Sequence, residues 1–300
     1  MRYFISAFLI IVLTFLSIFY LVLFTSPPVV LFDDQKPKIV FSDVGIEDGI
    51  QTKKGRITMS DGVSTDFFLR FPVSVEKKRL CLIMTGFLHG KEAVYYLSDK
   101  FIKKRGLALL AFDYYSRWPY GKNFLKQILY LKDFEDDIRL NMKICYMLTK
   151  VILNGKDVNK EGNLFIGASF GSFVCTYPVS KLSKNFSHIA LLYSGSDISD
   201  IAAGLLKKDI KFPFLSDLIG LYLEKRLYFS DPVFSSFSFQ GKKMLLISGT
   251  DDNIIPKKSR EELFKAYPNA EKEMVAGEHI SAKKRTLIDI SINYLDDFYK

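Results

Sequence analysis

The sequence predicts an α/β domain built on a mostly parallel, doubly wound sheet. Short apolar runs of strand length alternate with longer segments in which apolar residues recur at helical spacing. These runs show little polar alternation, which is typical of strands that are covered by helices on both faces. The chain has 300 residues, of which 48% are hydrophobic, so it is long enough to bury one large core.

The first apolar segment differs from the others in length. Tyr3 to Phe24 contains no charged residue and can cross the roughly 30 Å of bilayer hydrocarbon as a helix. A cleaved signal peptide is the alternative, but its apolar core is shorter and ends in small residues at a cleavage site. We expect residues 1–26 to form an uncleaved transmembrane anchor. Arg2 precedes the span and the charges after it roughly cancel, so the positive-inside rule places the large domain on the extracytoplasmic side.

Residues 27–54 carry proline, aspartate and lysine and are expected to be an extended tether to a domain that spans residues 55–300. The domain opens with two strand-like runs, Arg56–Ser60 and Ser64–Phe71, around the turn dipeptide Asp61-Gly62. An antiparallel hairpin should therefore precede the parallel strands.

Beyond the hairpin, predicted strands alternate with predicted helices, which indicates a doubly wound sheet. The strands are expected at Leu80–Met84, Leu107–Phe112, Leu164–Ile166, His188–Tyr193, Lys243–Ile247 and Lys272–Val275. The helices are expected near Glu92–Lys104, at Asp133–Leu153, after Ser169 to about Lys184, over Ser199–Tyr228 with a break at Pro213, at Lys257–Tyr267 and at Lys283–Tyr299.

The cysteines and histidines do not form the spacings of a metal site or a disulfide frame. The three cysteines, Cys81, Cys145 and Cys175, are isolated in apolar runs, which favours buried free thiols. The three histidines, His89, His188 and His279, are too far apart for a local pair of ligands. We therefore expect no metal and no organic cofactor.

The charge balance is basic, with 42 Lys and Arg against 33 Asp and Glu, a formal net charge of +9. The basic residues form short scattered clusters, and none reaches the length of a nucleic-acid-binding arm. A lysine-rich solvated surface is the simpler interpretation, with attraction to an anionic membrane as the alternative. We expect no nucleic-acid partner.

The segment around Ser169 carries the clearest chemical signal. The run Leu164–Ile166 ends in Gly-Ala-Ser-Phe-Gly, and a helical pattern follows. In such a strand–turn–helix unit the sharp turn exposes the serine hydroxyl, while Gly167 and Gly171 keep side chains out of the crowded turn. The Phe170 N–H would point into the same space at a helix N-terminus, where negative charge is favoured.

A nucleophilic serine needs a base and a carboxylate that orients the base. In a parallel sheet such groups gather at the carboxyl ends of the strands. Asp251 and Asp252 follow the predicted strand Lys243–Ile247, and His279 follows the last one. Asp197, after the strand His188–Tyr193, is a second possible acid.

In these motifs the chain resembles the α/β-hydrolase family over roughly residues 55–300. Family members carry Gly-x-x-Asp-x-x-Val/Ile-Pro after the seventh strand and Gly-x-His after the eighth. This chain matches the two motifs with Gly249, Asp252, Ile255 and Pro256, and with Gly277 and His279. The chain order Ser169, Asp252, His279 is also that of the family. The resemblance implies that Ser169 is the nucleophile, His279 the general base and Asp252 the orienting acid, with Asp251 capping the turn.

The resemblance also implies an oxyanion hole and a lid. The family commonly has His-Gly and an apolar residue after its third strand, whereas this chain has Thr85, Gly86 and Phe87. The backbone N–H groups of Phe87 and Phe170 are the expected donors, with Leu88 as the alternative to Phe87. His89 and His188 are expected to be structural. Residues 197–240 are longer than a simple crossover, and apolar residues there would form a small helical lid over Ser169.

These expectations describe an α/β-hydrolase fold with a small lid, preceded by one transmembrane helix. The implied function is a membrane-anchored serine hydrolase that cleaves carboxylic esters of a small-molecule acyl substrate through an acyl-enzyme. The same groups cleave thioesters and peptides on this fold, so an acyl-thioesterase or serine peptidase is the alternative enzyme. A hydrolase-like binding protein without turnover is the alternative from another class. The sequence predicts no oligomeric state.

Overall fold

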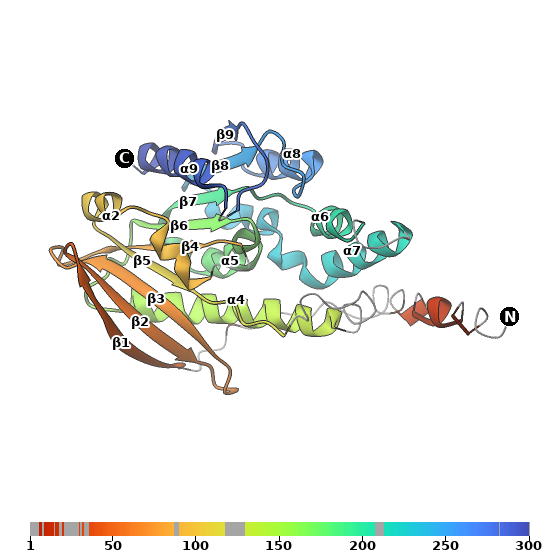
Figure 1. Ribbon diagram of the computed structural model, residues 1–300, viewed down its shortest axis with the longest axis horizontal. Helices are drawn as coiled ribbons and strands as arrows, with labels where there is room; N and C mark the ends of the chain where they lie inside the picture. Colours follow the sequence, from red (N-terminus) through yellow and green to blue (C-terminus); the bar gives the residue numbers. More distant parts are fainter. Residues whose placement is uncertain are drawn as a thin grey trace.

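The computed structural model describes residues 6–7, 9–14, 16–17, 20, 30, 32, 36–86, 90–117, 130–207, 213–281 and 283–299. These residues form a nine-stranded sheet in the order β1-β2-β3-β5-β4-β6-β7-β8-β9 (Figure 1). Sequence order reverses around β4, which lies between β5 and β6, so loops at the carboxyl ends of β4 and β6 diverge there. Such a switch point is where open α/β sheets place their ligands.

Three antiparallel strands open the sheet: β1 (Lys38–Glu47), β2 (Ile50–Thr58) and β3 (Ser64–Pro72). The predicted hairpin is confirmed, and Gly62 occupies its turn with a φ of 86° that suits glycine. Strand β3 then pairs antiparallel with β5 (Leu107–Phe112) and joins the hairpin to the parallel part of the sheet.

The prediction that residues 27–54 form an extended tether was wrong for its second half. Residues 38–47 pair with β2 along their length, so the sheet begins at Lys38 rather than near residue 55. Strand β1 lies at the edge of the sheet and is exposed at almost every position, including Val40, Val44 and Ile46. A strand held by backbone pairing, with no buried face, does not produce the alternation that sequence patterns detect.

The remaining strands are parallel, as predicted, and all of them except β9 are largely buried. They are β4 (Arg79–Met84), β6 (Asn163–Ala168), β7 (Phe186–Leu192), β8 (Lys243–Gly249) and β9 (Glu271–Val275). Every residue of β5 and β6 is buried, which places the core on both faces of the central strands. The three cysteines are buried and free, as the sequence predicted.

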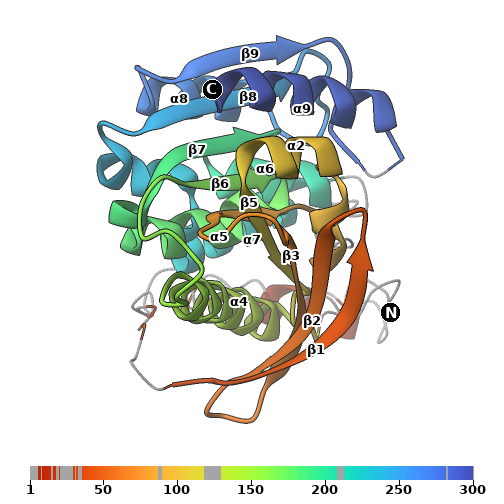
Figure 2. The ribbon, with the colours of Figure 1, turned by 90° about the vertical axis from the view of Figure 1, so that its left-hand side faces the viewer.

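Helices cover both faces of the sheet. The helices α2 (Asp99–Arg105) and α9 (Arg285–Phe298) lie on the face turned toward the viewer in Figure 2. On the other face lie α4 (Leu131–Leu153), α5 (Phe170–Lys181) and α8 (Lys257–Ala266). Asp296 of α9 is ion-paired with Lys104 and Arg105 of α2, which fixes these two helices to each other.

The prediction of one helix over Glu92–Lys104 was wrong in detail. A 3₁₀ turn, Lys91–Tyr95, comes first, and α2 starts only at Asp99. Ser98 separates them because its side chain accepts a hydrogen bond from the Phe101 N–H at 3.3 Å and so caps the new helix. Apolar spacing is similar through both pieces, so it does not reveal the interruption.

Between β7 and β8 the chain forms two helices, α6 (Ile198–Leu206) and α7 (Pro213–Leu227), at the right of Figure 1. Two 3₁₀ segments follow, Tyr228–Ser230 and Pro232–Phe239. The predicted break at Pro213 is the start of α7, where proline fits because its missing N–H has no helical partner.

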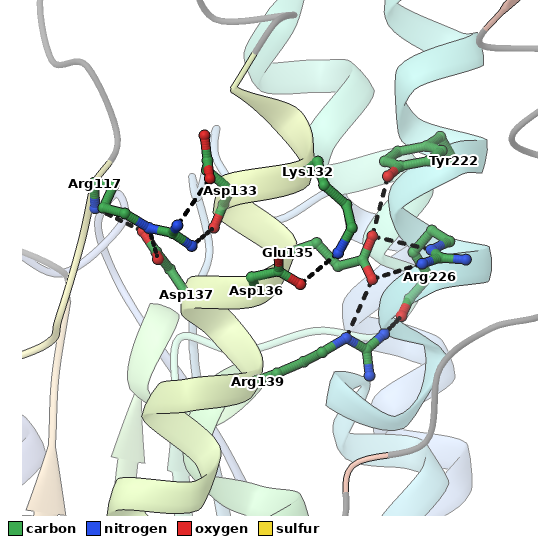
Figure 3. Close-up of polar contacts among 9 residues, drawn as sticks. All are labelled: Arg117, Lys132, Asp133, Glu135, Asp136, Asp137, Arg139, Tyr222 and Arg226. Carbon is green, nitrogen blue, oxygen red and sulfur yellow. Dashed lines mark hydrogen bonds and ion pairs between the residues drawn. The ribbon is translucent and has the colours of Figure 1, made fainter. Parts of the chain in front are cut away.

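A buried ionic cluster joins α7 to α4 (Figure 3). Glu135 of α4 is fully buried and accepts hydrogen bonds from Arg139, from both Nε and Nη2 of Arg226, and from the Tyr222 hydroxyl. Arg139 also donates to the Arg226 carbonyl. We call Glu135, Arg139, Tyr222 and Arg226 the Glu135 cluster. The sequence pattern did not predict the Glu135 cluster. Helical spacing indicates whether a position faces the core or the surface, but it does not indicate which charged residues pair with each other.

The predicted span from Tyr3 to Phe24 lies in part outside the described residues. Within the part of the chain that the structure describes, no helix combines the length and the apolar character needed to cross a membrane.

Candidate active site

Ser169 lies in the turn between β6 and α5 with φ of 52° and ψ of −125°. A non-glycine residue with positive φ is strained, and such strain persists only where surrounding structure enforces it. The Ser169 N–H donates to the Leu192 carbonyl of β7 at 2.8 Å, and the Ser169 carbonyl accepts from the buried Ser172 hydroxyl at 2.6 Å. These bonds hold the turn so that the side chain leaves the carboxyl edge of the sheet.

The two glycines of the turn are required by close packing. A Cβ on Gly171 would lie 2.9 Å from the Thr85 nitrogen and against the Met84 carbonyl. A Cβ on Gly167 would lie 2.9 Å from the Ser172 Cα. In both cases the Cβ would collide with backbone atoms that cannot move aside. This confirms the prediction that glycine is needed at both positions to keep side chains out of the crowded turn.

The loops after β8 and β9 pack directly on each other and bring Asp252 and His279 together. The Asp251 N–H donates to the Gly277 carbonyl at 2.9 Å. A Cβ on Gly249 would lie 2.6 Å from that same carbonyl oxygen, so glycine permits the approach. Gly277 itself has a φ of 134°, a conformation that side chains disfavour.

A continuous hydrogen-bonded chain joins the three predicted side chains. His279 Nδ1 lies 2.8 Å from Asp252 Oδ2, and His279 Nε2 lies 2.7 Å from Ser169 Oγ. An ionised carboxylate can only accept, so Nδ1 carries the ring proton. Nε2 is then the acceptor for the Ser169 hydroxyl. The arrangement can take a proton from Ser169 without any rearrangement of heavy atoms.

The Asp252 side chain is fully buried, yet its carboxylate is held in the charged form. Burial alone raises the pKa of Asp252, but hydrogen bonds and charge lower it below its usual value. The donors are His279 and the N–H groups of Ile255 and Ile254, each of the latter at 2.9 Å from Oδ1. The His279 side chain is also almost fully buried and meets the edge of the Tyr193 ring at 5.9 Å between centroids.

The other candidate acids lie elsewhere. Asp197 caps α6 by accepting from the Asp200 N–H at 3.1 Å, and it pairs with Lys258. Asp251 is exposed and accepts from the Thr250 hydroxyl at 2.8 Å. Neither is the carboxylate that contacts His279. His188 lies on β7 beside Phe298 and Tyr299, away from the Ser169 turn.

Of the two predicted oxyanion donors, the structure describes Phe170 but not Phe87. Phe170 is the first residue of α5, so its N–H lies at the helix N-terminus beside Ser169. Phe87, together with Leu88 and His89, falls outside the described residues. Tyr114 contacts both the loop after β4 and the start of α5. Its hydroxyl donates to the Thr85 carbonyl at 2.9 Å, and its ring packs edge-to-face with the Phe170 ring at 5.3 Å between centroids.

A cavity of about 310 Å³ opens beside Ser169. Ser169, Thr85 and Gly86 line it, residues of three strands form one wall, and residues of α9 form another. A second cavity of about 310 Å³ lies on the opposite face, between α4, α5, α6 and α7, and Phe170 and Phe173 line it while Ser169 does not. Leu205, Leu206 and Leu223, which belong to the segment that was expected to form a lid over Ser169, line this second cavity.

Sequence reasoning missed the α9 wall of the first cavity. Ile288, Ser291, Ile292 and Leu295 recur at helical spacing on one side of α9. That spacing signals a core-facing helix, but it does not separate a face that packs solidly from one that borders a cavity. The roles of Tyr114 and Ser172 were also missed. The Tyr114 hydroxyl donates to the carbonyl of Thr85, which is distant in sequence. The Ser172 hydroxyl donates to the carbonyl of Ser169, and this contact depends on the geometry of the turn.

Comparisons with known proteins match the fold and not the sequence. No protein-family model matches the chain, and no curated protein matches it in sequence. Among solved structures, acetyl xylan esterase 1 from Thermoanaerobacterium sp. has a TM-score of 0.63 at 15% identity and covers 89% of each chain. Acetyl xylan esterase from Paenibacillus sp. R4 has a TM-score of 0.64 at 12% identity, covering 90% of this chain and 91% of its own. An esterase from Pyrococcus furiosus has a TM-score of 0.55 at 18% identity, covering 91% and 96%. The chain therefore has the α/β-hydrolase fold.

Proposed function

We propose that this protein is a serine hydrolase that cleaves carboxylic esters through an acyl-enzyme intermediate. The observation that carries the proposal is the hydrogen-bonded chain from Asp252 through His279 to Ser169, with distances of 2.8 and 2.7 Å. A hydroxyl, an imidazole and a buried carboxylate in this order are the parts that nucleophilic acyl transfer requires. The esterases that share the fold support an ester as the substrate.

Each residue has a defined part in the two half-reactions. Ser169 Oγ bonds to the acyl carbonyl carbon while its proton passes to His279 Nε2. The carbonyl oxygen becomes an oxyanion, which the Phe170 N–H stabilises at the N-terminus of α5. When the C–O bond to the alcohol breaks, His279 gives its proton to the leaving oxygen. Water then repeats the sequence on the acyl-enzyme and releases the acid.

The Asp252 carboxylate serves both half-reactions without taking the proton. It fixes the tautomer of His279 and stabilises the imidazolium that forms in each step. Its lowered pKa keeps it ionised at neutral pH. Because the backbone donors Ile254 and Ile255 hold the carboxylate, it does not need to reorganise as charge develops.

Matched p-nitrophenyl ester, thioester and peptide substrates with the same acyl group test the proposal. We expect the ester to be hydrolysed fastest by wild type and Ser169→Ala to retain no more than background rate. Faster cleavage of the thioester or of the peptide would instead make the protein an acyl-thioesterase or a serine peptidase. Absence of turnover and of phosphonate labelling in folded wild type would support the binding-protein alternative.

We further propose that residues 1–26 anchor the protein in a membrane with the hydrolase domain on the extracytoplasmic side. The support is the uncharged run from Tyr3 to Phe24 and the arginine before it. In fractionated cells the protein should stay in the membrane pellet after a high-salt wash, and protease added from outside should digest the domain. Release by salt would indicate cleavage or electrostatic attachment instead.

A further inference from the structure

The cavity beside Ser169 has the chemistry of a pocket for a hydrocarbon chain. Ile83, Ile166 and Leu192 of three adjacent strands form one wall, and Ile288, Ile292 and Leu295 of α9 face them. The polar side chains along it are hydroxyls, and none of its lining residues in the described chain is charged. An apolar lining of this kind favours an apolar occupant.

The position of the cavity decides which part of an ester enters it. The acyl carbon must bond to Ser169 Oγ, and the carbonyl oxygen must turn toward the N–H donors at the edge of the sheet. Ser169 and Gly86 both line the cavity, so the substituent on that carbonyl has direct access to it. The second cavity is lined by Phe170 and not by Ser169, so the first cavity is the one that borders the nucleophile directly.

We propose that the interior cavity between the sheet and α9 is the acyl-chain pocket, and that α9 sets the longest chain accepted. This inference rests on the proposed esterase function and adds a substrate class to it: esters of medium-chain fatty acids. The volume supports that class. About 310 Å³ is twice the roughly 150 Å³ of an apolar cavity that holds benzene, so it has room for roughly a dozen carbons.

The wall formed by α9 is rigid enough to act as a limit. Asp296 on α9 accepts from Arg105 Nη2 at 2.7 Å and from Lys104 at 3.0 Å, and the Arg105 side chain is only 13% exposed. Tyr96 and Leu97, which precede α2, line the same cavity. A longer chain must therefore displace α9 from α2 or leave carbons outside the pocket.

Two substitutions at Ile292 test the limit in opposite directions. Ile292 is half-buried, so both a larger and a smaller side chain can be accommodated without disrupting the core. With p-nitrophenyl acetate, butyrate, octanoate, dodecanoate and palmitate, wild type should prefer octanoate or dodecanoate. Ile292→Trp should lower kcat/KM for dodecanoate about ten-fold or more relative to acetate, and Ile292→Ala should raise the relative rate on palmitate.

A matched control places the same bulk in the second cavity. Leu205 lines that cavity from α6 and is 42% exposed, so Leu205→Trp should fold and leave the chain-length profile unchanged. Rates of labelling by a small ethyl fluorophosphonate, which has no long chain, should be similar in wild type and Leu205→Trp, and both Ile292 variants should still be labelled at Ser169. This readout separates damage to Ser169 from a change in the pocket.

The outcomes distinguish the two proposals. If wild type neither labels nor hydrolyses any ester, the esterase function itself fails. If all proteins label and hydrolyse acetate but Ile292→Trp leaves the chain-length profile unchanged, or if Leu205→Trp shifts it instead, the α9 cavity is not the acyl pocket. A change in preference among alcohols at a fixed acyl group in Ile292→Trp would assign the cavity to the leaving group and also overturn the inference.

Discussion

Two buried carboxylates in this protein have opposite surroundings. Glu135 and Asp252 both have fully buried side chains, with 0% exposure. Glu135 is held by two arginines and a tyrosine, and these partners join α4 to α7. Asp252 is held by two backbone N–H groups and one imidazole, whose other nitrogen is directed at a hydroxyl.

The difference lies in what the partners can do with a proton. Guanidinium groups stay charged at every accessible pH, so the Glu135 cluster is a fixed set of paired charges. Imidazole gains and loses a proton near neutral pH, so the charge of Asp252 can stabilise a transient imidazolium. Burial of a carboxylate is therefore not by itself a sign of catalysis; the chemistry of its partner decides.

Asp252→Asn should nearly abolish catalysis and leave the fold intact. The amide can still accept from the Ile254 and Ile255 N–H groups, but it no longer fixes the tautomer of His279 or stabilises the imidazolium. We expect kcat to fall by about 10⁴-fold. Steady-state kinetics on an ester measure the loss, and chemical denaturation measures the fold. A decrease of less than ten-fold would mean that Asp252 is not the orienting acid.

Glu135→Gln should show the opposite pattern. It removes the negative charge with which the buried Arg139 and Arg226 are paired, which we expect to lower the free energy of unfolding by about 3–5 kcal/mol. The kcat of the folded protein should change little. Replacing all three charges, with Glu135→Leu, Arg139→Met and Arg226→Met together, is the control and should recover much of the stability. A large loss of kcat with stability unchanged would give Glu135 a part in catalysis.

His188 shows what happens to a half-buried imidazole that no carboxylate of the described residues contacts. Burial first, and then the charges of Lys243 and Arg79, lower the pKa of His188 to about 4 from 6.5. The unfolded chain therefore binds a proton that the native protein does not between these values. Stability from this site is fully present above pH 6.5 and is lost as the pH falls toward 4.

The expected loss is about 1–2 kcal/mol, below the full value of the shift because the ring is partly exposed. Denaturation curves of wild type and His188→Gln, measured from pH 7 to pH 4, give the difference. The variant should have the flatter profile in this window. Parallel profiles for the two proteins would contradict the assignment of a lowered pKa to His188.

Asp197→Ala should have the smallest effect. Asp197 caps α6, so its removal is expected to cost about 1 kcal/mol of stability, while Asp197→Asn keeps the cap. Neither change should alter kcat beyond about two-fold. If Asp197→Asn lowered kcat as far as Asp252→Asn, the second acid considered from the sequence would share the role of Asp252.

The central sheet could be predicted from the sequence because its strands are buried on both faces and are almost wholly apolar. The side chains of Ser169, Asp252 and His279 could be brought together because each follows a predicted parallel strand, and parallel strands share a carboxyl edge. Strand β1 could not be predicted, since it has no buried face. The Glu135 cluster and the cavity under α9 could not be predicted either, because both depend on which helices face each other across long stretches of sequence.

The most direct test is the site and rate of fluorophosphonate labelling, located by peptide mass spectrometry. The reagent reacts with a serine hydroxyl only where a base activates it. The account predicts one labelled residue, Ser169, with labelling absent in Ser169→Ala, strongly slowed in Asp252→Asn and unchanged in Glu135→Gln. Folded wild-type protein that stays unlabelled, or that carries the label on another residue, would contradict it.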